Sequence, residues 1–157
     1  MSGLSHLDKW GRARMVDVSA KAVTARTAAA KAVLTCRRET LDQVCAGTTP
    51  KGAVIQTAEL AGVMGAKRTA DLIPLCHPLR LTHVEVRIEL DESLPGFRVF
   101  AEARTKAETG VEMEALTAVS VACLTLFDML KAVDGTMAIG GIEATSKTGG
   151  KSEAGLK

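Results

Sequence analysis

The chain has 157 residues, of which 46% are apolar and 24% charged, and its net charge is only +2. This length is enough for one domain with its own core, and the composition is ordinary for a soluble globular protein. Near-balanced charge, with 3% aromatic residues and no Tyr, argues against a nucleic-acid-binding module, which needs a basic surface and rings that stack on bases.

The N-terminal residues and the cysteines bear on the cell compartment. The first ten residues include Asp8 and Lys9 and lack an apolar core, so no secretory signal is visible. No apolar run is long enough to span a membrane, and the four cysteines show no C-x-x-C spacing. We therefore expect reduced thiols, a cytoplasmic location, no membrane partner and no metal site.

The first third of the chain predicts two strand-like segments and a helix. Residues 1–14 are polar and mixed in charge, and indicate a flexible arm ahead of a single domain at 15–157. Residues 15–19 alternate apolar and polar side chains, which suits an extended segment. Ala-rich residues 28–35 fit either a helix or a strand, and we predict a strand. Residues 37–46 have apolar side chains at helical spacing, and Gly47 after them is suited to end a helix.

The middle of the chain predicts a second helix and a hairpin. The helix should run over residues 53–69, where small side chains would allow another element to approach closely. Residues 84–90 alternate Val, Val, Ile and Leu with charged side chains, and residues 97–103 alternate in the same way after a turn. This pattern is typical of two antiparallel strands with one buried face.

A third helix is expected over residues 111–133, without a charged side chain from Ala115 to Phe127. A helix that is apolar on most sides must be buried on most sides, so one face should meet the sheet and another a second subunit. A short strand at 136–139 and a Gly- and Lys-rich tail should follow. The order β-α-α-β-β-α-β predicts an α+β, ferredoxin-like antiparallel sheet with helices packed on one face and an extra N-terminal helix.

Residues 71–78 form a conformationally restricted segment that also carries reactive side chains. They include two prolines, Cys76 and His77. Each proline fixes its own φ and biases the preceding residue toward extended conformations. The ring of His77 is therefore held in place, either to contact a ligand or simply to satisfy a backbone carbonyl.

Charged residues suggest further chemistry. Asp128 and Lys131 are three residues apart and should lie on one helix face. They could form an acid/base pair or an ordinary surface ion pair. Glu112 and Glu114 open the same helix, where carboxylates also compensate the helix dipole. Lys51 precedes a helix start that would suit an anion. Other basic residues that would suit phosphates, if they converge, are Lys67, Arg68, Lys147 and Lys151.

With these residues described, nearly the whole chain resembles the MoaC family, the cyclic pyranopterin monophosphate synthases of molybdenum-cofactor biosynthesis. The resemblance rests on several motifs in the same order, at residues 15–21, 67–69, 71–78, 109–117, 128–133 and 147–152. It implies a lyase that converts 3′,8-cyclo-7,8-dihydroguanosine 5′-triphosphate, supplied by a radical enzyme, to cyclic pyranopterin monophosphate and pyrophosphate. It also implies a homohexamer, a trimer of dimers with sites at the dimer interfaces.

Position by position, the resemblance makes Asp128 the catalytic acid/base, with Lys51 and Lys131 as its partners. The residues that it implies for substrate binding are Leu75, Cys76, His77, Met113 and Glu114, with Glu112, Arg26, Lys67 and Lys147 as additional contacts. It implies no organic cofactor and leaves open whether a divalent ion such as Mg²⁺ accompanies the triphosphate. The competing interpretation is a non-catalytic nucleotide-binding module that uses the lysines only to hold phosphates.

Overall fold

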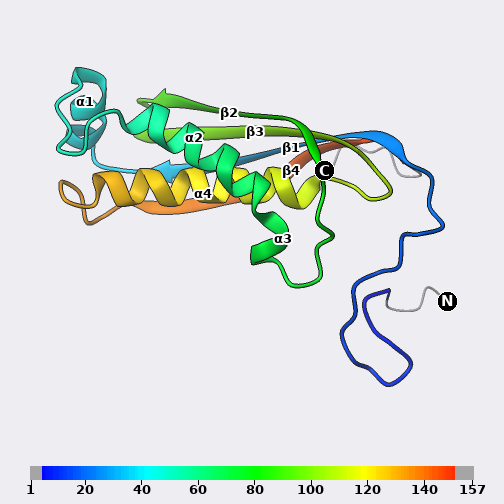
Figure 1. The fold of residues 1–157 in the computed structure, drawn as a ribbon. Helices are drawn as coiled ribbons and strands as arrows, with labels where there is room; N and C mark the ends of the chain where they lie inside the picture. The colour runs from blue at the N-terminus through cyan, green and yellow to red at the C-terminus, as the bar shows by residue number, and fades with distance from the viewer. Residues whose placement is uncertain (1–4, 151–157) are drawn as a thin grey trace.

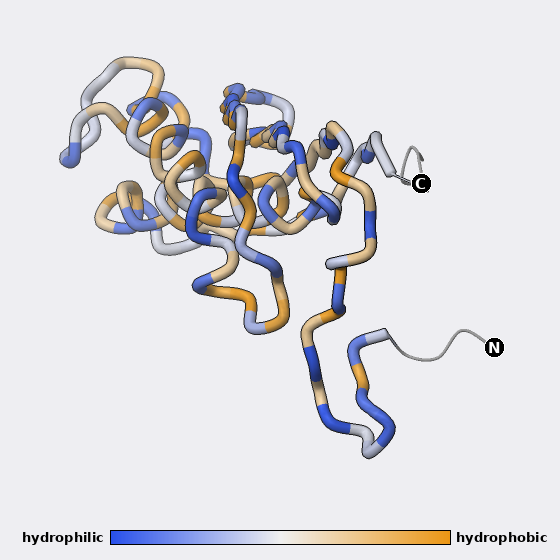
Figure 2. Tube along the Cα trace, turned by 45° about the vertical axis from the view of Figure 1, so that its right-hand side comes forward, coloured by the Kyte–Doolittle hydropathy of each residue, from blue (hydrophilic) through white to orange (hydrophobic). Residues whose placement is uncertain are grey.

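The computed structural model describes residues 5–150. Its elements in chain order are β1 (Thr24–Thr35), α1 (Arg38–Ala46), α2 (Val54–Lys67), α3 (Thr69–Leu72), β2 (Leu81–Asp91), β3 (Gly96–Ala107), α4 (Glu112–Leu130) and β4 (Ala138–Thr148). Figure 1 shows α2 and α4 running alongside the sheet, while the segment before β1 extends away from this body. In Figure 2 that segment is largely hydrophilic, whereas the segment that follows α3 is hydrophobic.

The four strands form one antiparallel sheet in the order β2-β3-β1-β4. Alternate side chains of β1 and β3 are buried against the helices, and on β1 three of them are alanines. Small side chains on the central strand leave room for α4, which is itself rich in buried alanine. This is the α+β, ferredoxin-like arrangement that the sequence predicted.

Helix α4 is the central core helix. By length and composition alone it could cross a membrane, but ten of its 19 residues are buried within this domain. Helix α2 packs closely along it: a Cβ added at Gly65 would lie 2.7 Å from Cγ2 of Val121. Only glycine permits this approach, so the small residues expected to bring an element close do so between α2 and α4.

The structure confirms the strand at residues 28–35, the three predicted helices and the β2–β3 hairpin. It corrects the C-terminal prediction: the strand expected at 136–139 continues as β4 to Thr148, through the first part of the predicted tail, and pairs with β1. Residues 15–19, expected to be extended, belong to no helix or strand, and the short helix α3 was not predicted. The extra N-terminal helix is not clearly shown, because no helix precedes β1 within the residues that the structure describes.

Candidate active site

A pocket of about 480 Å³ lies between the loop after α3 and the first turn of α4. The loop supplies Leu75, Cys76 and His77, and the helix supplies Glu112 and Met113. Two segments that are about 35 positions apart in the chain therefore line one pocket, because α3 and Cys76 of the loop after it contact α4. Five predicted substrate-binding residues are brought together here.

A second pocket of about 490 Å³ is lined by the predicted residues Arg26 and Lys147. It shares Lys21, Thr109 and Gly110 with the first pocket, so the two form one continuous hollow. This hollow combines an apolar and a cationic part, as a nucleotide with an aromatic base and a phosphate chain requires.

The cations of the second pocket are anchored by protein groups. Lys147 Nζ lies 2.5 Å from Glu112 Oε1, and both side chains are about one-quarter exposed. The guanidinium of Arg26 donates from Nε and Nη2 to the carbonyl oxygens of Ala107 and Glu108, each at 3.2 Å. These contacts hold both cations at the ends of β1 and β4, where an anionic ligand could add further hydrogen bonds.

His77 satisfies a backbone carbonyl while it lines the first pocket. Its Nε2 lies 2.5 Å from the carbonyl oxygen of Val16, so the ring donates from Nε2 to the segment before β1. That segment also contributes to the pocket wall through Ser5, His6 and Val18. The structural role considered for this histidine is therefore present, and it holds the ring at the wall of the pocket.

Glu114 is buried and does not line the large pocket. The residue is only 2% exposed. Its Oε1 lies 3.9 Å from Cys76 Sγ, and its Oε2 has no hydrogen-bond partner. Burial raises the pKa of Glu114, and burial with the neighbouring Glu114 carboxylate raises the pKa of Cys76 to about 11. Cys76 is thus a thiol at neutral pH, which argues against a nucleophilic role.

The predicted ligand Lys67 also lies outside the large pocket. It lines, with Glu114, a smaller cavity of about 110 Å³ beside α3. The structure therefore divides the predicted binding residues between the continuous hollow and this adjacent cavity.

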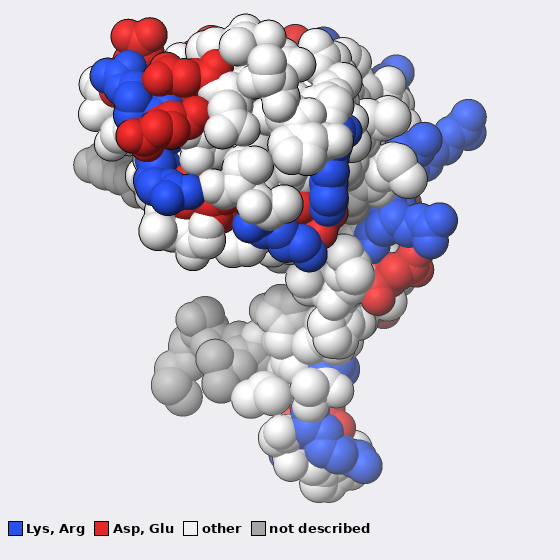
Figure 3. Space-filling view, turned by 90° about the vertical axis from the view of Figure 1, so that its left-hand side faces the viewer, with Lys and Arg blue, Asp and Glu red and all other residues white. Residues whose placement is uncertain are grey.

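The predicted catalytic residues form a separate cluster at the other end of α4. Asp128 Oδ1 lies 2.9 Å from Lys131 Nζ, and its Oδ2 lies 3.3 Å from Lys51 Nζ. Lys51 also donates to the carbonyl oxygen of Asp128 at 2.9 Å. Hydrogen bonds from Lys131 and then Lys51 lower the pKa of Asp128, so the exposed carboxylate is ionised between two ammonium groups. Figure 3 views this end of the molecule and shows interleaved positive and negative side chains.

One subunit does not bring the two groups into one site. Glu112 and Asp128 lie at opposite ends of the straight helix α4, sixteen residues or about 24 Å apart at 1.5 Å per residue. Lys51, Asp128 and Lys131 line neither part of the hollow. The distance exceeds the reach of side chains that act on the same atoms.

Comparison with known proteins gives the family. A model described as "MoaC family" matches residues 15–150. The chain belongs to the MoaC family. Proteins named cyclic pyranopterin monophosphate synthase from a Methylobacterium species and from Brucella ovis are 59% and 60% identical, over 97% of this chain and 95% and 93% of theirs. One with the same name from Cereibacter sphaeroides is 59% identical over 97% of this chain and 96% of its own.

Several pocket residues were not selected from the sequence of this MoaC family member. Lys21 lies where the two parts of the hollow join, next to Thr109 and Gly110. All three fall inside motifs already recognised at residues 15–21 and 109–117, but their spacing to other basic residues gave no indication of convergence. Lys151 lies outside the described residues, and no cluster of three metal-ligating side chains occurs within residues 5–150.

Proposed function

We propose that the protein is a cyclic pyranopterin monophosphate synthase of molybdenum-cofactor biosynthesis. It is a lyase that converts 3′,8-cyclo-7,8-dihydroguanosine 5′-triphosphate to cyclic pyranopterin monophosphate and pyrophosphate. The observation that carries the proposal is the Lys51–Asp128–Lys131 cluster, because a carboxylate held between two ammonium groups can relay protons. Family membership and relatives of about 60% identity with this name support it.

The reaction matches these side chains. Converting the purine to a pterin requires hydrolysis of the five-membered ring and several proton transfers. Closing the cyclic phosphate requires a sugar hydroxyl to attack the α-phosphorus, with the P–O bond to pyrophosphate breaking. Asp128 acts as acid/base with Lys51 and Lys131, whose positive charge also stabilises charge that develops on the phosphate.

The hollow at the start of α4 holds the substrate. Leu75, Cys76 and Met113 offer an apolar wall to the base, and His77 positions it from the same loop. The triphosphate lies along the cationic part of the hollow, toward Arg26, Lys147 and the unassigned Lys21. Glu112 anchors Lys147, and Lys67 with Glu114 supports the site from the adjacent cavity.

A complete site therefore needs two subunits. The hollow of one subunit would lie against the Lys51–Asp128–Lys131 cluster of another, which brings the substrate to the acid/base within a dimer. Leu60 and Met64 of α2 and Leu124 of α4 are more than half exposed, an apolar surface that suits burial between subunits. We propose a homohexamer built as a trimer of dimers with these composite sites.

The reaction needs no organic cofactor. A divalent ion such as Mg²⁺ would arrive with the triphosphate as part of the substrate. A radical enzyme of the same pathway would supply the cyclised nucleotide, and we place the protein in the cytoplasm, where GTP-derived substrates are made. The near-balanced net charge of +2, with both signs mixed on the face in Figure 3, argues against nucleic acid as a partner.

Incubation of the purified protein with the cyclised nucleotide tests this function. We expect stoichiometric release of pyrophosphate together with the fluorescence of the oxidised pterin product. A binding module on the same fold would retain the nucleotide and release no pyrophosphate, and that result would contradict the proposal.

A further inference from the structure

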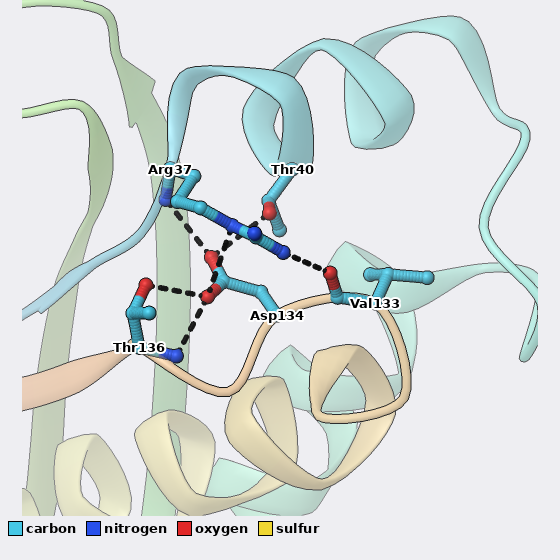
Figure 4. Close-up of polar contacts among 5 residues, drawn as sticks. All are labelled: Arg37, Thr40, Val133, Asp134 and Thr136. Carbon is cyan, nitrogen blue, oxygen red and sulfur yellow. Dashed lines mark hydrogen bonds and ion pairs between the residues drawn. The ribbon is translucent and has the colours of Figure 1, made fainter.

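The two lysines of the catalytic cluster come from different segments of the chain. Lys131 follows the last turn of α4, whereas Lys51 lies in the loop between α1 and α2. The packing of α2 on α4 orients the end of that loop, but the start of α1 needs its own attachment. Figure 4 shows that attachment: the side chain of Asp134, from the α4–β4 loop, reaches the beginning of α1.

Asp134 is a fully buried carboxylate with both oxygens occupied. Its Oδ2 accepts hydrogen bonds from the Arg37 N–H and from Thr40 Oγ1, each at 2.9 Å. Its Oδ1 accepts from the N–H and Oγ1 of Thr136 at 2.8 and 2.6 Å. Burial raises its pKa, but these hydrogen bonds outweigh burial and hold the pKa well below the usual value. A buried charge this fully satisfied fixes the geometry around it.

The carboxylate anchors the start of α1, which has no side-chain cap. Arg37, at the N-cap position, makes no capping hydrogen bond with its own side chain. Asp134 instead holds the N–H of Arg37 and the hydroxyl of Thr40, so it ties the first turn of α1 to the α4–β4 loop. The guanidinium of Arg37 then returns across the contact, with Nε 3.5 Å from Asp134 Oδ1 and Nη2 donating to the carbonyl of Val133.

This contact is connected to Lys131 through one hydrogen-bonded turn and to Lys51 through the length of α1. On one side, the N–H groups of Val133 and Asp134 both donate to Leu130 O at 3.0 Å, which fixes the turn that carries Lys131. On the other side, α1 leads to the Lys51 loop, closed by the Thr49 Oγ1 donation to Gly52 O at 2.8 Å. We propose that Asp134 is a positioning residue that sets the separation of Lys51 and Lys131 around Asp128.

This inference rests on the proposed function and deepens it. Asp134 touches no substrate, so its loss should lower kcat through the lysine geometry and leave substrate binding, at the far end of α4, intact. Asp134→Asn is therefore expected to lower kcat at least ten-fold with a KM change below about three-fold. Asp91→Asn is the matched control, because Asp91 accepts a similar set of bonds from Ser93 and Arg98 in the distant β2–β3 turn.

A pair of milder variants separates positioning from general stability. Thr40→Val removes a hydrogen bond between the two segments, whereas Thr136→Val removes one within the α4–β4 loop. At equal loss of Tm, Thr40→Val should lower kcat more than Thr136→Val. Equal kcat losses at equal Tm, or a wild-type kcat in folded Asp134→Asn, would overturn the inference.

Hydrogen–deuterium exchange without substrate provides a readout that does not depend on the reaction. In Thr40→Val, amides of residues 47–53 and 131–134 should exchange faster than in wild type, with no change in Asp91→Asn. Unchanged exchange in both segments would overturn the inference even if the variant were less active. A wild-type protein that releases no pyrophosphate would instead contradict the proposed function, while the exchange result would still decide whether Asp134 orders the lysine-bearing segments.

Discussion

Glu112 and Asp128 stand at opposite ends of α4, about 24 Å apart along a helix with no break. Glu112 belongs to the hollow that suits a nucleotide, and Asp128 to the lysine cluster that suits proton transfer. A rigid core helix cannot shorten to join them. In the proposed function the two halves of the chemistry meet between subunits, and each half can be tested by itself.

Asp128 is the group whose loss should affect the chemistry most. Asp128→Asn keeps the shape of the side chain but removes the charge that both lysines contact, so kcat should fall about 10²-fold or more. Tm should change little, because these groups are exposed and surface ion pairs contribute little to stability. Steady-state pyrophosphate release measures the effect, with exposed Asp42→Asn on α1 as control. A near-normal kcat in a folded oligomer would rule out the acid/base role.

Lys147 should act on binding and not on the chemical step. Lys147→Ala removes a cation from the hollow and leaves Glu112 unpaired, which repels the triphosphate. A charge-assisted hydrogen bond of about 1.5–3 kcal/mol corresponds to a rise in KM of ten-fold or more. Lys31→Ala is the control, since Lys31 of β1 pairs with Glu143 of β4 but lines neither pocket. Equal KM values for the two variants would remove Lys147 from the site.

The buried Glu114 carboxyl should make the folded protein less stable, relative to the unfolded chain, as pH rises. Burial raises its folded-state pKa above 4.5, so the folded protein binds the proton more tightly than the unfolded chain. The stability linked to this proton is fully present below pH 4.5 and is lost as pH rises through the folded-state pKa. Glu114→Gln should therefore match wild type in Tm at low pH and exceed it increasingly toward neutral pH. Parallel Tm curves for the two proteins would contradict this account.

The contact between α2 and α4 predicts a steric effect at Gly65. Gly65→Ala would place its Cβ 2.7 Å from Val121 Cγ2 and 2.8 Å from Val121 Cβ, so the helices must separate. We expect a loss of about 1–3 kcal/mol in the free energy of unfolding. Gly140→Ala is the control, because nothing lies within 4 Å of its added Cβ. Urea denaturation at one fixed subunit concentration compares the variants, and equal midpoints would contradict the packing described.

The sequence predicted elements best where one local pattern decided them. The alternation at residues 84–90 and 97–103 matches the sides that β2 and β3 bury, except that Leu90, at the end of the first run, is exposed. The C-terminal strand was predicted too short because Gly140, Gly141 and the polar residues after them have weak strand preference. Pairing with the central strand β1 supplies what local preference lacks there, and no local pattern reports that pairing.

The candidate site divides in the same way. Groups of residues close in sequence, such as Asp128 with Lys131, were predicted together because a helix turn fixes their contact. Spacing predicts no long-range relationship: only the family resemblance pairs Lys51 with Asp128, and Lys21 joins the hollow through the segment before β1. The burial of Glu114 away from the large pocket depends on which face of α4 meets α3, which spacing alone does not settle.

Mixing two inactive variants tests the shared site most directly. Asp128→Asn disables the lysine cluster and His77→Ala disables the hollow, and each variant should be nearly inactive as a homo-oligomer. After the two are dissociated, mixed and reassembled, random pairing in a two-fold dimer should restore activity to about a quarter of the wild-type value, because half of the dimers contain one intact composite site. Activity that stays at the average of the two separate variants, in mixed oligomers verified by mass, would contradict a site built from two subunits.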